Sequence, residues 1–275
     1  MSWLITGAGG MLGTDLVARL RRDGEQVAAA TRADLDIRDV RAVSAAVAGH
    51  QYVINCAAWT AVDDAETHED AALALNGTAV GNLAGACDAA GADLLQISTD
   101  YVLHGDGTAP YPEDAPTGPI NAYGRTKLAG ERAALGHYVV RTAWLYGAHG
   151  PNFVSTMLRL AAERDTVDVV NDQYGQPTWT ADLADQLVLL ARSGAPRGVY
   201  HGTNAGETTW YGLAREVFTR HGLDPARVRP TTSDRFVRPA VRPGYGVLGH
   251  GAWAAAGLAP MRDWREALAA YLSVA

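Results

Sequence analysis

Short apolar runs alternate with longer amphipathic stretches along the first half of the chain. Apolar runs of four or five residues are typical of buried strands, and the stretches between them have helical spacing. Strands are predicted at 3–6, 26–30, 52–55, 94–98 and 138–141, and helices at 12–22, 71–90 and 122–135. Strands separated in this way form parallel βαβ units with right-handed crossovers. The sequence therefore predicts an α/β fold, a Rossmann-type doubly wound parallel sheet with helices on both faces.

The pattern becomes less regular after residue 146. Helices are predicted at 152–163, 181–192, 209–221 and 263–272. The segment 104–119 holds four Pro and three Gly and is expected to be a loop, and 227–251 is rich in Pro, Gly and Arg. We therefore expect one domain over 1–146 and a smaller C-terminal lobe over 147–275, with a part near 165–205 returning to the main sheet.

Composition narrows the class of protein. With 275 residues, 48% of them hydrophobic and 19% charged, the chain can bury a sizeable core. The net charge of −7 argues against whole-chain nucleic-acid binding. No apolar run reaches the roughly 18 residues of a membrane span, and the first residues lack a basic region before an apolar one. The two cysteines form no CxxC, so a reducing, cytoplasmic location is expected without zinc or disulfides.

A glycine-rich turn follows the first predicted strand. Gly7, Gly10 and Gly13 form G-x-x-G-x-x-G immediately before and within the first helix. Positions without a Cβ allow backbone to approach a pyrophosphate closely, and a helix N-terminus offers free N–H groups and a positive dipole end. In a βαβ unit this pattern predicts a dinucleotide-binding domain over 1–146. The alternative is a tight strand-to-helix turn that binds no ligand.

The end of the second predicted strand bears on which dinucleotide is bound. An acidic residue there would bind the ribose 2′-hydroxyl, but the chain has Thr31 and Arg32. A guanidinium suits a 2′-phosphate, which favours NADPH. NADH stays open as an alternative, because Asp34 or Asp36 could reach the adenosine. A solvated surface Arg is the competing interpretation.

Tyr123 and Lys127 form the motif Y-x-x-x-K, and Lys127 is the only lysine of the chain. Residues i and i+4 of a helix lie on one face, so the phenol and the ammonium point the same way. A nearby cation lowers the pKa of a phenol, which suits proton transfer to an alkoxide. The alternative is a surface Tyr and Lys on an amphipathic helix.

Thr99 lies where the predicted strand 94–98 ends. Ligands meet parallel sheets at the carboxyl ends of their strands. Thr99 is therefore expected to bind a substrate carbonyl oxygen together with Tyr123, unless Thr99 and Asp100 only brace the following loop. We predict Thr99, Tyr123 and Lys127 as the catalytic residues.

The chain resembles the dTDP-4-dehydrorhamnose reductase family within the extended short-chain dehydrogenase/reductase superfamily. The matching stretches are GAGGMLG at 7–13, DLDIRD at 34–39, NCAAWTAVDDAE at 55–66, ISTDYVLHG at 97–105, NAYGRTKLAGE at 121–131, RTAWLYG at 141–147, NFVSTMLRLA at 152–161 and DQYGQPTWTADLA at 172–184. The resemblance implies NADPH- or NADH-dependent reduction of a sugar 4-ketone, with the C-terminal lobe over 147–275 binding the substrate.

The resemblance also implies roles for individual residues. It implies cofactor contacts from Gly10, Met11, Leu12, Asp36, Ile37, Ala58, Trp59, Thr60, Tyr123 and Lys127. The glycine turn and the end of the second strand add Gly7, Gly13 and Arg32 to this set. Sugar contacts would come from Thr99, Asp100, Tyr123 and Trp144. Some family members bind magnesium through acidic residues at a dimer contact. The matching residues, Asp15 and Asp182, are shorter than Glu, so Mg²⁺ is not expected, and a homodimer stays open.

The C-terminal lobe departs from the family pattern. Family members commonly carry R-P-x-N-S-x-L, whereas this chain has Tyr245 and Gly246 in place of the Asn-Ser pair. This departure lies in a segment that could contact the substrate lobe. A basic stretch at 227–242 suits the diphosphate of a dTDP-sugar, with Arg238 and Arg242 as the predicted contacts. A solvated basic loop is the alternative.

Related chemistries need residues that this chain does not place suitably. The similar sugar-nucleotide 4,6-dehydratases carry Thr-Asp-Glu at the corresponding strand end, where the Glu removes a proton beside the ketone. In this chain the third residue is Tyr101, which is a poor base for that step. Epimerase-reductases need an added Cys and His pair, for which Cys56 and Cys87 are poorly placed. The leading hypothesis is reduction of dTDP-4-dehydro-β-L-rhamnose to dTDP-L-rhamnose. The alternatives are another dTDP-deoxysugar 4-ketoreductase, for example in dihydrostreptose synthesis, and a non-catalytic NADP-binding regulatory subunit.

Overall fold

The centre of the molecule is a parallel sheet of six strands in the order β10-β5-β4-β3-β1-β2. The computed structural model describes residues 1–274. The strands are β1 (Ser2–Thr6), β2 (Gln26–Ala30), β3 (Tyr52–Asn55), β4 (Asp93–Thr99), β5 (Tyr138–Thr142) and β10 (Val199–His201). The first five match the predicted strands, and the predicted α/β fold is confirmed.

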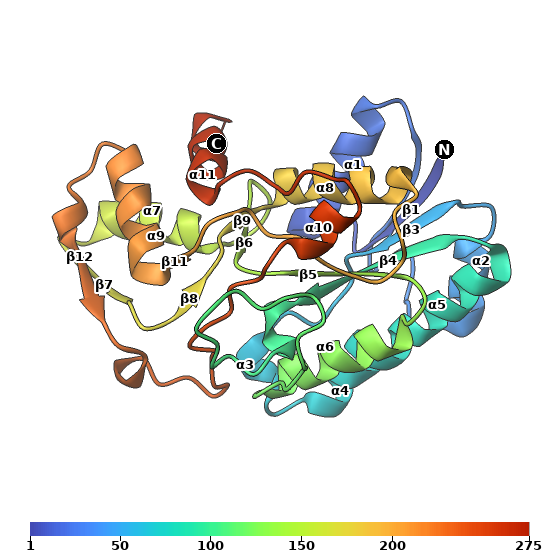
Figure 1. The fold of residues 1–275 in the computed structure, drawn as a ribbon, viewed down its shortest axis with the longest axis horizontal. Coiled ribbons are helices and arrows are strands. Elements are labelled where there is room, and N and C mark those ends of the chain that lie inside the picture. The colour runs from blue at the N-terminus through green and yellow to red at the C-terminus, as the bar shows by residue number, and fades with distance from the viewer. Residues whose placement is uncertain (275) are drawn as a thin grey trace.

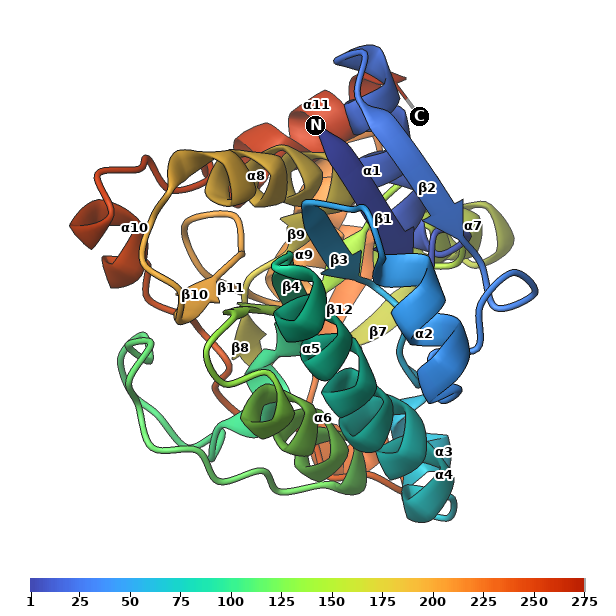
Figure 2. The ribbon, with the colours of Figure 1, turned by 90° about the vertical axis from the view of Figure 1, so that its right-hand side faces the viewer.

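Helices cover both faces of this sheet (Figure 2). Side chains on β1 alternate between two apolar clusters, because Trp3 and Ile5 face one side and Leu4 faces the other. The first cluster includes α1 (Met11–Arg22) and α8 (Thr180–Ser193), and the second includes α2 (Val40–Val47) and α5 (Ala79–Ala90). The helix α6 (Ala122–Ala133) lies beside α5 and contacts β4. Both faces of the strands are thus buried, as the continuous apolar runs indicated.

One predicted helix is interrupted. The stretch predicted as a single helix over 71–90 consists of α4 (Glu69–Leu73), a π-helical turn (Ala74–Thr78) and α5. Gly77 lies in the π turn, and a Cβ there would meet the side chains of Leu73 and Ala129. The π turn therefore lets this segment pack closely against α6, and such turns are often found at functional sites.

The second half of the chain adds an apolar cluster of its own, at the left in Figure 1. It is formed around α7 (Phe153–Glu163), α9 (Trp210–Arg220) and α11 (Trp264–Val274), which match predicted helices. The sequence prediction missed three pairs of short strands, which are β6 (Leu145–Tyr146) with β9 (Thr178–Trp179), β7 (Val167–Val170) with β12 (Val228–Thr231), and β8 (Tyr174–Gly175) with β11 (Thr208–Thr209).

Several short elements complete the described chain. They are the α-helices α3 (Val62–Ala65) and α10 (Gly251–Ala255) and the 3₁₀ turns Asp100–Val102, Pro225–Arg227 and Ser233–Arg235. Within the segment 165–205, β10 pairs with β5 of the main sheet and α8 packs against α1. The domain boundary at residue 146 stays a prediction.

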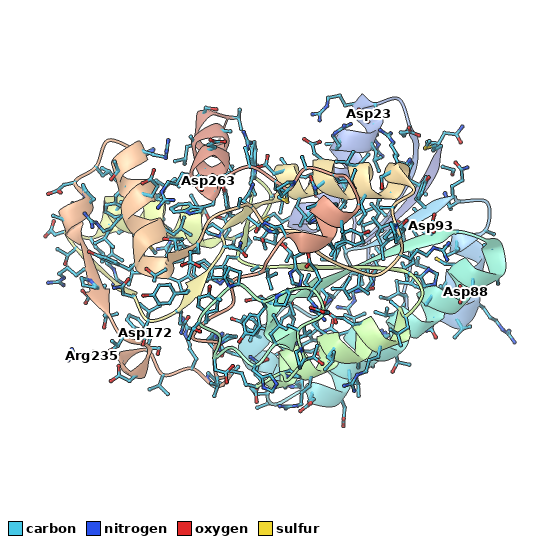
Figure 3. The ribbon with its side chains drawn as sticks, in the orientation of Figure 1. Asp23, Asp88, Asp93, Asp172, Arg235 and Asp263 are labelled. Carbon is cyan, nitrogen blue, oxygen red and sulfur yellow. The ribbon has the colours of Figure 1, made fainter. Side chains whose placement is uncertain are left out.

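Exposed acidic side chains, such as those of Asp23, Asp88 and Asp172, lie at the outer surface (Figure 3). Within residues 1–274, no helix has the length and apolar character needed to cross a bilayer.

Candidate active site

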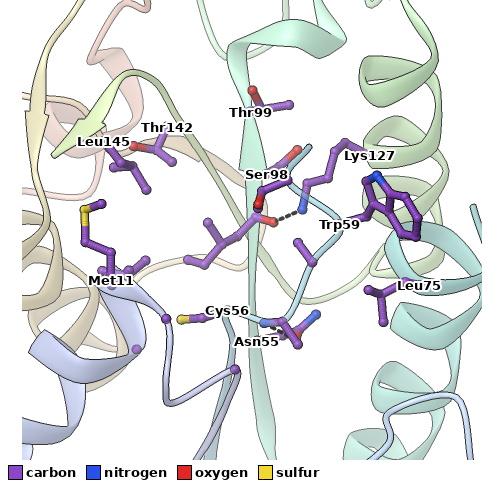
Figure 4. Close-up of a pocket in the computed structure, with 18 of the residues that line it drawn as sticks. Met11, Asn55, Cys56, Trp59, Leu75, Ser98, Thr99, Lys127, Thr142 and Leu145 are labelled. Carbon is purple, nitrogen blue, oxygen red and sulfur yellow. Dashed lines mark hydrogen bonds between the residues drawn. The ribbon is translucent and has the colours of Figure 1, made fainter. Parts of the chain in front are cut away.

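A cavity of about 960 Å³ lies at the carboxyl ends of β1, β3, β4 and β5. Such a volume is at the upper end of the range for small-molecule sites. The glycine turn, the loop after β3, the end of β4 and the face of α6 all line it. Trp144 and Trp210 line it on the side of the apolar cluster around α7, α9 and α11, which we call the lobe. Figure 4 shows Met11, Cys56, Trp59, Thr99 and Lys127 around this space. This is the edge of the sheet at which ligands of parallel folds bind.

The glycine turn has the geometry that a pyrophosphate needs. Gly7 has a φ of +65°, and a Cβ at this position would lie 2.5 Å from the Ala57 nitrogen. Gly13 likewise has no room for a Cβ, because Gly7 and Ala8 lie against it. Gly10 is the N-cap residue of α1, and neither a side-chain cap nor an acidic residue occupies the first turn of the helix. The N–H groups of that turn therefore face the cavity free to bind an anion, as the dinucleotide prediction requires.

The adenosine end of the cavity is lined by Arg32, Asp36 and Ile37, and also by Arg38, which the sequence analysis did not single out. The Arg38 guanidinium donates to both oxygens of Asp36, from Nε to Oδ1 over 2.9 Å and from NH2 to Oδ2 over 2.6 Å. This pairing lowers the pKa of Asp36 to about 2. Arg32 makes no ion pair with any residue within 1–274 and remains free to meet a phosphate.

The loop after β3 brings Ala58, Trp59 and Thr60 to the cavity. Asn76 fixes this loop from the π turn. Its Oδ1 accepts a hydrogen bond from the Trp59 N–H over 2.8 Å, and its Nδ2 donates to the Trp59 carbonyl over 3.1 Å. Asn76 was missed in the sequence, although a buried amide within an Ala- and Leu-rich helix could have indicated such a role.

Thr99 ends β4 and is buried beside Asp100. The Thr99 hydroxyl donates to Asp100 Oδ1 over 2.9 Å and accepts from the Tyr101 N–H over 3.2 Å. Burial raises the pKa of the Asp100 carboxyl to about 7. The other oxygen of Asp100 faces Gly246, where a Cβ would lie 2.5 Å from it. Gly246, at which this chain departs from the family pattern, thus lies directly against Asp100, a predicted sugar contact.

Tyr123 and Lys127 both reach the cavity from α6. Asn121 caps this helix, since its Oδ1 accepts from the Gly124 N–H over 2.8 Å. Lys127 is 4% exposed, and its ammonium donates to the Ile97 carbonyl over 2.6 Å (Figure 4). Burial lowers the pKa of Lys127 to about 8.

The electrostatics of Tyr123 differ from the sequence expectation. Burial is the largest influence and raises the pKa of the phenol, and the Asp100 carboxylate raises it further. The Thr99 hydroxyl lowers it. The phenol of Tyr123 is therefore protonated at neutral pH.

Trp144 lines the lobe side of the cavity in a strained conformation. Its φ of +46° is the only positive value among the non-glycine residues within 1–274. Its indole stacks on Trp210, with ring centroids 3.6 Å apart and planes 11° apart. Gly175 packs beneath the ring, where a Cβ would lie 2.5 Å from the indole. Trp210 also lines the cavity and was missed in the sequence, because a Trp at a helix start resembles ordinary packing.

The two arginines predicted to meet a diphosphate lie elsewhere. Neither Arg238 nor Arg242 lines the cavity. Arg242 binds both oxygens of Asp63, and Arg238 lies 3.8 Å from the same carboxylate. The structure therefore brings together every other predicted site residue but not these two.

The acidic residues considered for magnesium also have partners. Asp15 accepts a hydrogen bond from the Thr180 hydroxyl, and Asp182 binds the Arg262 guanidinium through both oxygens. Within residues 1–274, no group of three or more His, Cys, Asp or Glu side chains is arranged to hold a metal ion.

Comparison with known proteins gives consistent matches over the whole chain. The family model described as the RmlD substrate binding domain matches residues 1–275. A dTDP-4-dehydrorhamnose reductase of Streptomyces griseus is 58% identical, covering 97% of this chain and 91% of that protein. A dTDP-4-keto-6-deoxy-D-glucose reductase of Streptomyces niveus is 56% identical, covering 97% of this chain and 94% of that protein.

Solved structures give the same result. The dTDP-4-dehydrorhamnose reductase of Bacillus anthracis in complex with NADP is 36% identical, with a TM-score of 0.96 over 100% of both chains. The Clostridium acetobutylicum protein described by the same name is 40% identical, with a TM-score of 0.95 over 100% of this chain and 99% of that one. With these matches over its whole length, the chain belongs to the dTDP-4-dehydrorhamnose reductase family.

Proposed function

We propose that this protein reduces the 4-ketone of a dTDP-linked 4-dehydro-6-deoxy sugar with NADPH, converting dTDP-4-dehydro-β-L-rhamnose to dTDP-L-rhamnose. The observation that carries the proposal is that Thr99, Tyr123 and Lys127 line the same cavity as the glycine turn. A reducing cofactor and a carbonyl group can therefore meet within reach of a proton donor. The names of the Streptomyces griseus and Bacillus anthracis relatives support this reaction.

The cavity fits a dinucleotide at one end and a sugar at the other. The uncapped first turn of α1 would bind the pyrophosphate, and Arg32 would meet the 2′-phosphate that distinguishes NADPH from NADH. The Bacillus anthracis structure, which contains NADP, supports the choice of cofactor. When bound, NADPH supplies a hydride to carbon 4 of the sugar.

The side chains of the chain itself complete the reduction. Tyr123 donates its phenolic proton to the ketone oxygen, so that carbon 4 ends with a new C–H bond and a hydroxyl group. Thr99 orients that oxygen from the end of β4. Lys127 would hold the ribose of the cofactor, and its positive charge would stabilise the phenolate left on Tyr123.

The identity of the sugar is a separate part of the proposal. Relatives of similar identity carry other substrate names, such as the dTDP-4-keto-6-deoxy-D-glucose reductase of Streptomyces niveus. The contact between Asp100 and Gly246 lies where the chain departs from the family pattern, and it keeps a 4-ketoreductase for another dTDP-deoxysugar as the second candidate. A non-catalytic regulatory role is disfavoured because the Thr99, Tyr123 and Lys127 set is complete.

The test is product analysis with a panel of synthetic dTDP-4-keto sugars. The purified protein and NADPH are mixed with each sugar, and the product is identified by NMR. We expect dTDP-L-rhamnose to form with the highest kcat/KM. A higher kcat/KM for another keto sugar would select the second candidate, and no NADPH oxidation with any sugar would refute both.

The compartment is proposed on the cysteines. Cys56 and Cys87 are both unpaired, as is usual in a reducing compartment, so we infer a cytoplasmic enzyme.

A further inference from the structure

The helix α6 carries a third polar side chain in line with the two of the Y-x-x-x-K motif. Glu131 follows Lys127 by four residues, as Lys127 follows Tyr123, so the three lie along one face of the helix. This face is turned toward β4. The Lys127 ammonium donates to the Ile97 carbonyl over 2.6 Å, and the Ser98 hydroxyl donates to Glu131 Oε1 over 2.6 Å. The helix is thus joined to two neighbouring residues of β4, the strand that ends at Thr99.

Glu131 is buried, with 6% of its surface exposed, and both of its oxygens are engaged. Arg141, on β5, donates from Nε to Oε1 and from NH2 to Oε2, each over 2.9 Å. Arg141 is itself 3% exposed and also donates to the Glu113 carbonyl over 3.3 Å. A buried ion pair contributes little net stability compared with apolar packing, so its presence beside a catalytic lysine calls for a reason beyond folding.

We propose that Glu131 is a positioning residue of the reductase: its carboxylate, oriented by Arg141 and Ser98, keeps the Lys127 ammonium charged on the carbonyl of Ile97. This inference rests on the role proposed above for Lys127. Glu131 touches neither substrate nor cofactor and acts through the lysine.

The charges around Lys127 show why such a residue is needed. Burial is the largest influence on the ammonium and lowers its pKa, which favours the neutral amine. Two groups act in the opposite direction, namely Glu131 on the same helix and Cys56 after β3. Burial raises the pKa of the Cys56 thiol to about 12, so this thiol is neutral at pH 7. Glu131 is therefore the anion that keeps Lys127 charged.

The other charged and titratable groups of this region face different partners. Tyr123 lies one turn along α6 and is influenced by Asp100 from the end of β4. Arg141 on β5 faces Glu131 and limits how strongly the carboxylate acts on the lysine. The arrangement predicts opposite effects for the two members of the ion pair. Loss of the carboxylate lowers the pKa of Lys127, and loss of the guanidinium raises it.

The composition of the chain allows a direct measurement. Lys127 is the only lysine, so protein grown with lysine labelled with ¹³C at its ε carbon gives a single lysine signal in an NMR titration. For the wild type we expect a midpoint near pH 8. Glu131→Gln should lower the midpoint by about one pH unit or more, and Arg141→Gln should raise it. An unchanged midpoint in Glu131→Gln, or shifts of the same sign in both variants, would overturn the proposal.

The matched control is Glu69→Gln. Glu69, on α4, pairs through both oxygens with Arg125 of α6, and this pair is exposed to solvent. The control removes an ion pair from α6 without changing the field at the lysine, so its midpoint should stay at the wild-type value. A downward shift equal to that of Glu131→Gln would mean that helix anchoring alone explains the effect, and the proposal would be wrong.

A double variant guards against loss of folding. In Glu131→Gln with Arg141→Gln, two amides that can bond to each other replace the buried pair, so no unpaired charge is left. Its midpoint should still lie below that of the wild type, because the anion is gone, and an unchanged midpoint would refute the proposal. The titration needs neither NADPH nor sugar, so its result stands even if the proposed sugar reduction fails.

A kinetic measurement links the charge to turnover. The alkaline limb of kcat in Glu131→Gln should move to lower pH by the same amount as the NMR midpoint, with little change in the KM of the sugar nucleotide. If the NMR midpoint moves and the alkaline limb does not, the electrostatic effect exists but Glu131 does not serve the reaction, and the proposal fails.

Discussion

The cavity has two walls that are built in different ways. The sheet wall consists of strand ends, the glycine turn and α6, with Gly10, Thr99 and Lys127 placed by regular main-chain geometry. The lobe wall consists of Trp144, Leu145 and Trp210, and it depends on a two-residue strand, a strained φ and the stacking of two indoles. The Streptomyces griseus and Streptomyces niveus relatives are both named as reductases, but for different sugars. In our proposal the reduction depends on the sheet wall, and the choice of sugar depends on the lobe wall.

The largest expected effect falls on the sheet wall. Tyr123→Phe removes the proton donor and keeps the ring, so kcat should fall by about 10²- to 10⁴-fold. Binding of NADPH, measured by its fluorescence, should stay close to that of the wild type. Near-normal turnover would show that another group supplies the proton.

The Asp100 carboxyl gives a prediction for pH dependence. Its pKa is raised from 3.8 to about 7 by burial, so the folded state binds more protons than the unfolded state between these values. Stability should therefore fall as the pH rises from about 4 to 7, by about 2–4 kcal/mol from this group. Asp100→Asn removes the ionisation and should be more stable than the wild type at pH 8, as measured by urea unfolding. Equal slopes of stability against pH in both proteins would contradict the account.

The lobe wall should respond in substrate binding and not in chemistry. Trp210→Ala removes the ring that holds Trp144 in its strained conformation, so the KM of the sugar nucleotide should rise about tenfold. The Kd of NADPH should not change. Trp210→Phe retains part of the stack, so its KM for the sugar nucleotide should lie between that of the wild type and that of Trp210→Ala. A loss confined to kcat would mean that Trp210 acts in the chemical step, and it would contradict the assignment of substrate binding to the lobe wall.

The smallest effect concerns the cofactor. Arg32→Ala should weaken NADPH about fivefold and leave NADH almost unchanged, because only NADPH carries the 2′-phosphate. Arg38→Ala is the matched comparison, since its guanidinium is already bound to Asp36. Equal losses for NADPH and NADH in Arg32→Ala would refute the assignment.

The sheet wall could largely be predicted from the sequence. Buried parallel strands give continuous apolar runs, and Thr6, Asn55 and Thr99 end them within a residue or two of the predicted limits. The order of strand, glycine turn and helix then places Gly7 at the cavity. The Y-x-x-x-K motif on a helix likewise places Tyr123 on the same face as Lys127. The π turn was missed because the close approach of Gly77 to α6 is a tertiary effect that leaves no local pattern.

The lobe side could be predicted much less. A pair such as β6 with β9 has two residues in each strand, too few to show alternation. Arg238 and Arg242 were expected at a diphosphate because the basic stretch was visible, whereas their partner Asp63 lies far away in the sequence. The Asn76 amide and the Arg38 guanidinium were missed for a similar reason, since their roles depend on contacts made only after folding.

The most direct test of the account follows the hydride itself. Wild-type protein is incubated with NADPH deuterated on the transferred position of the nicotinamide and with dTDP-4-dehydro-β-L-rhamnose, and the product is examined by NMR. The account predicts deuterium at carbon 4 of the sugar and a new hydroxyl on the same carbon. Deuterium at any other carbon, or none in the sugar, would contradict it.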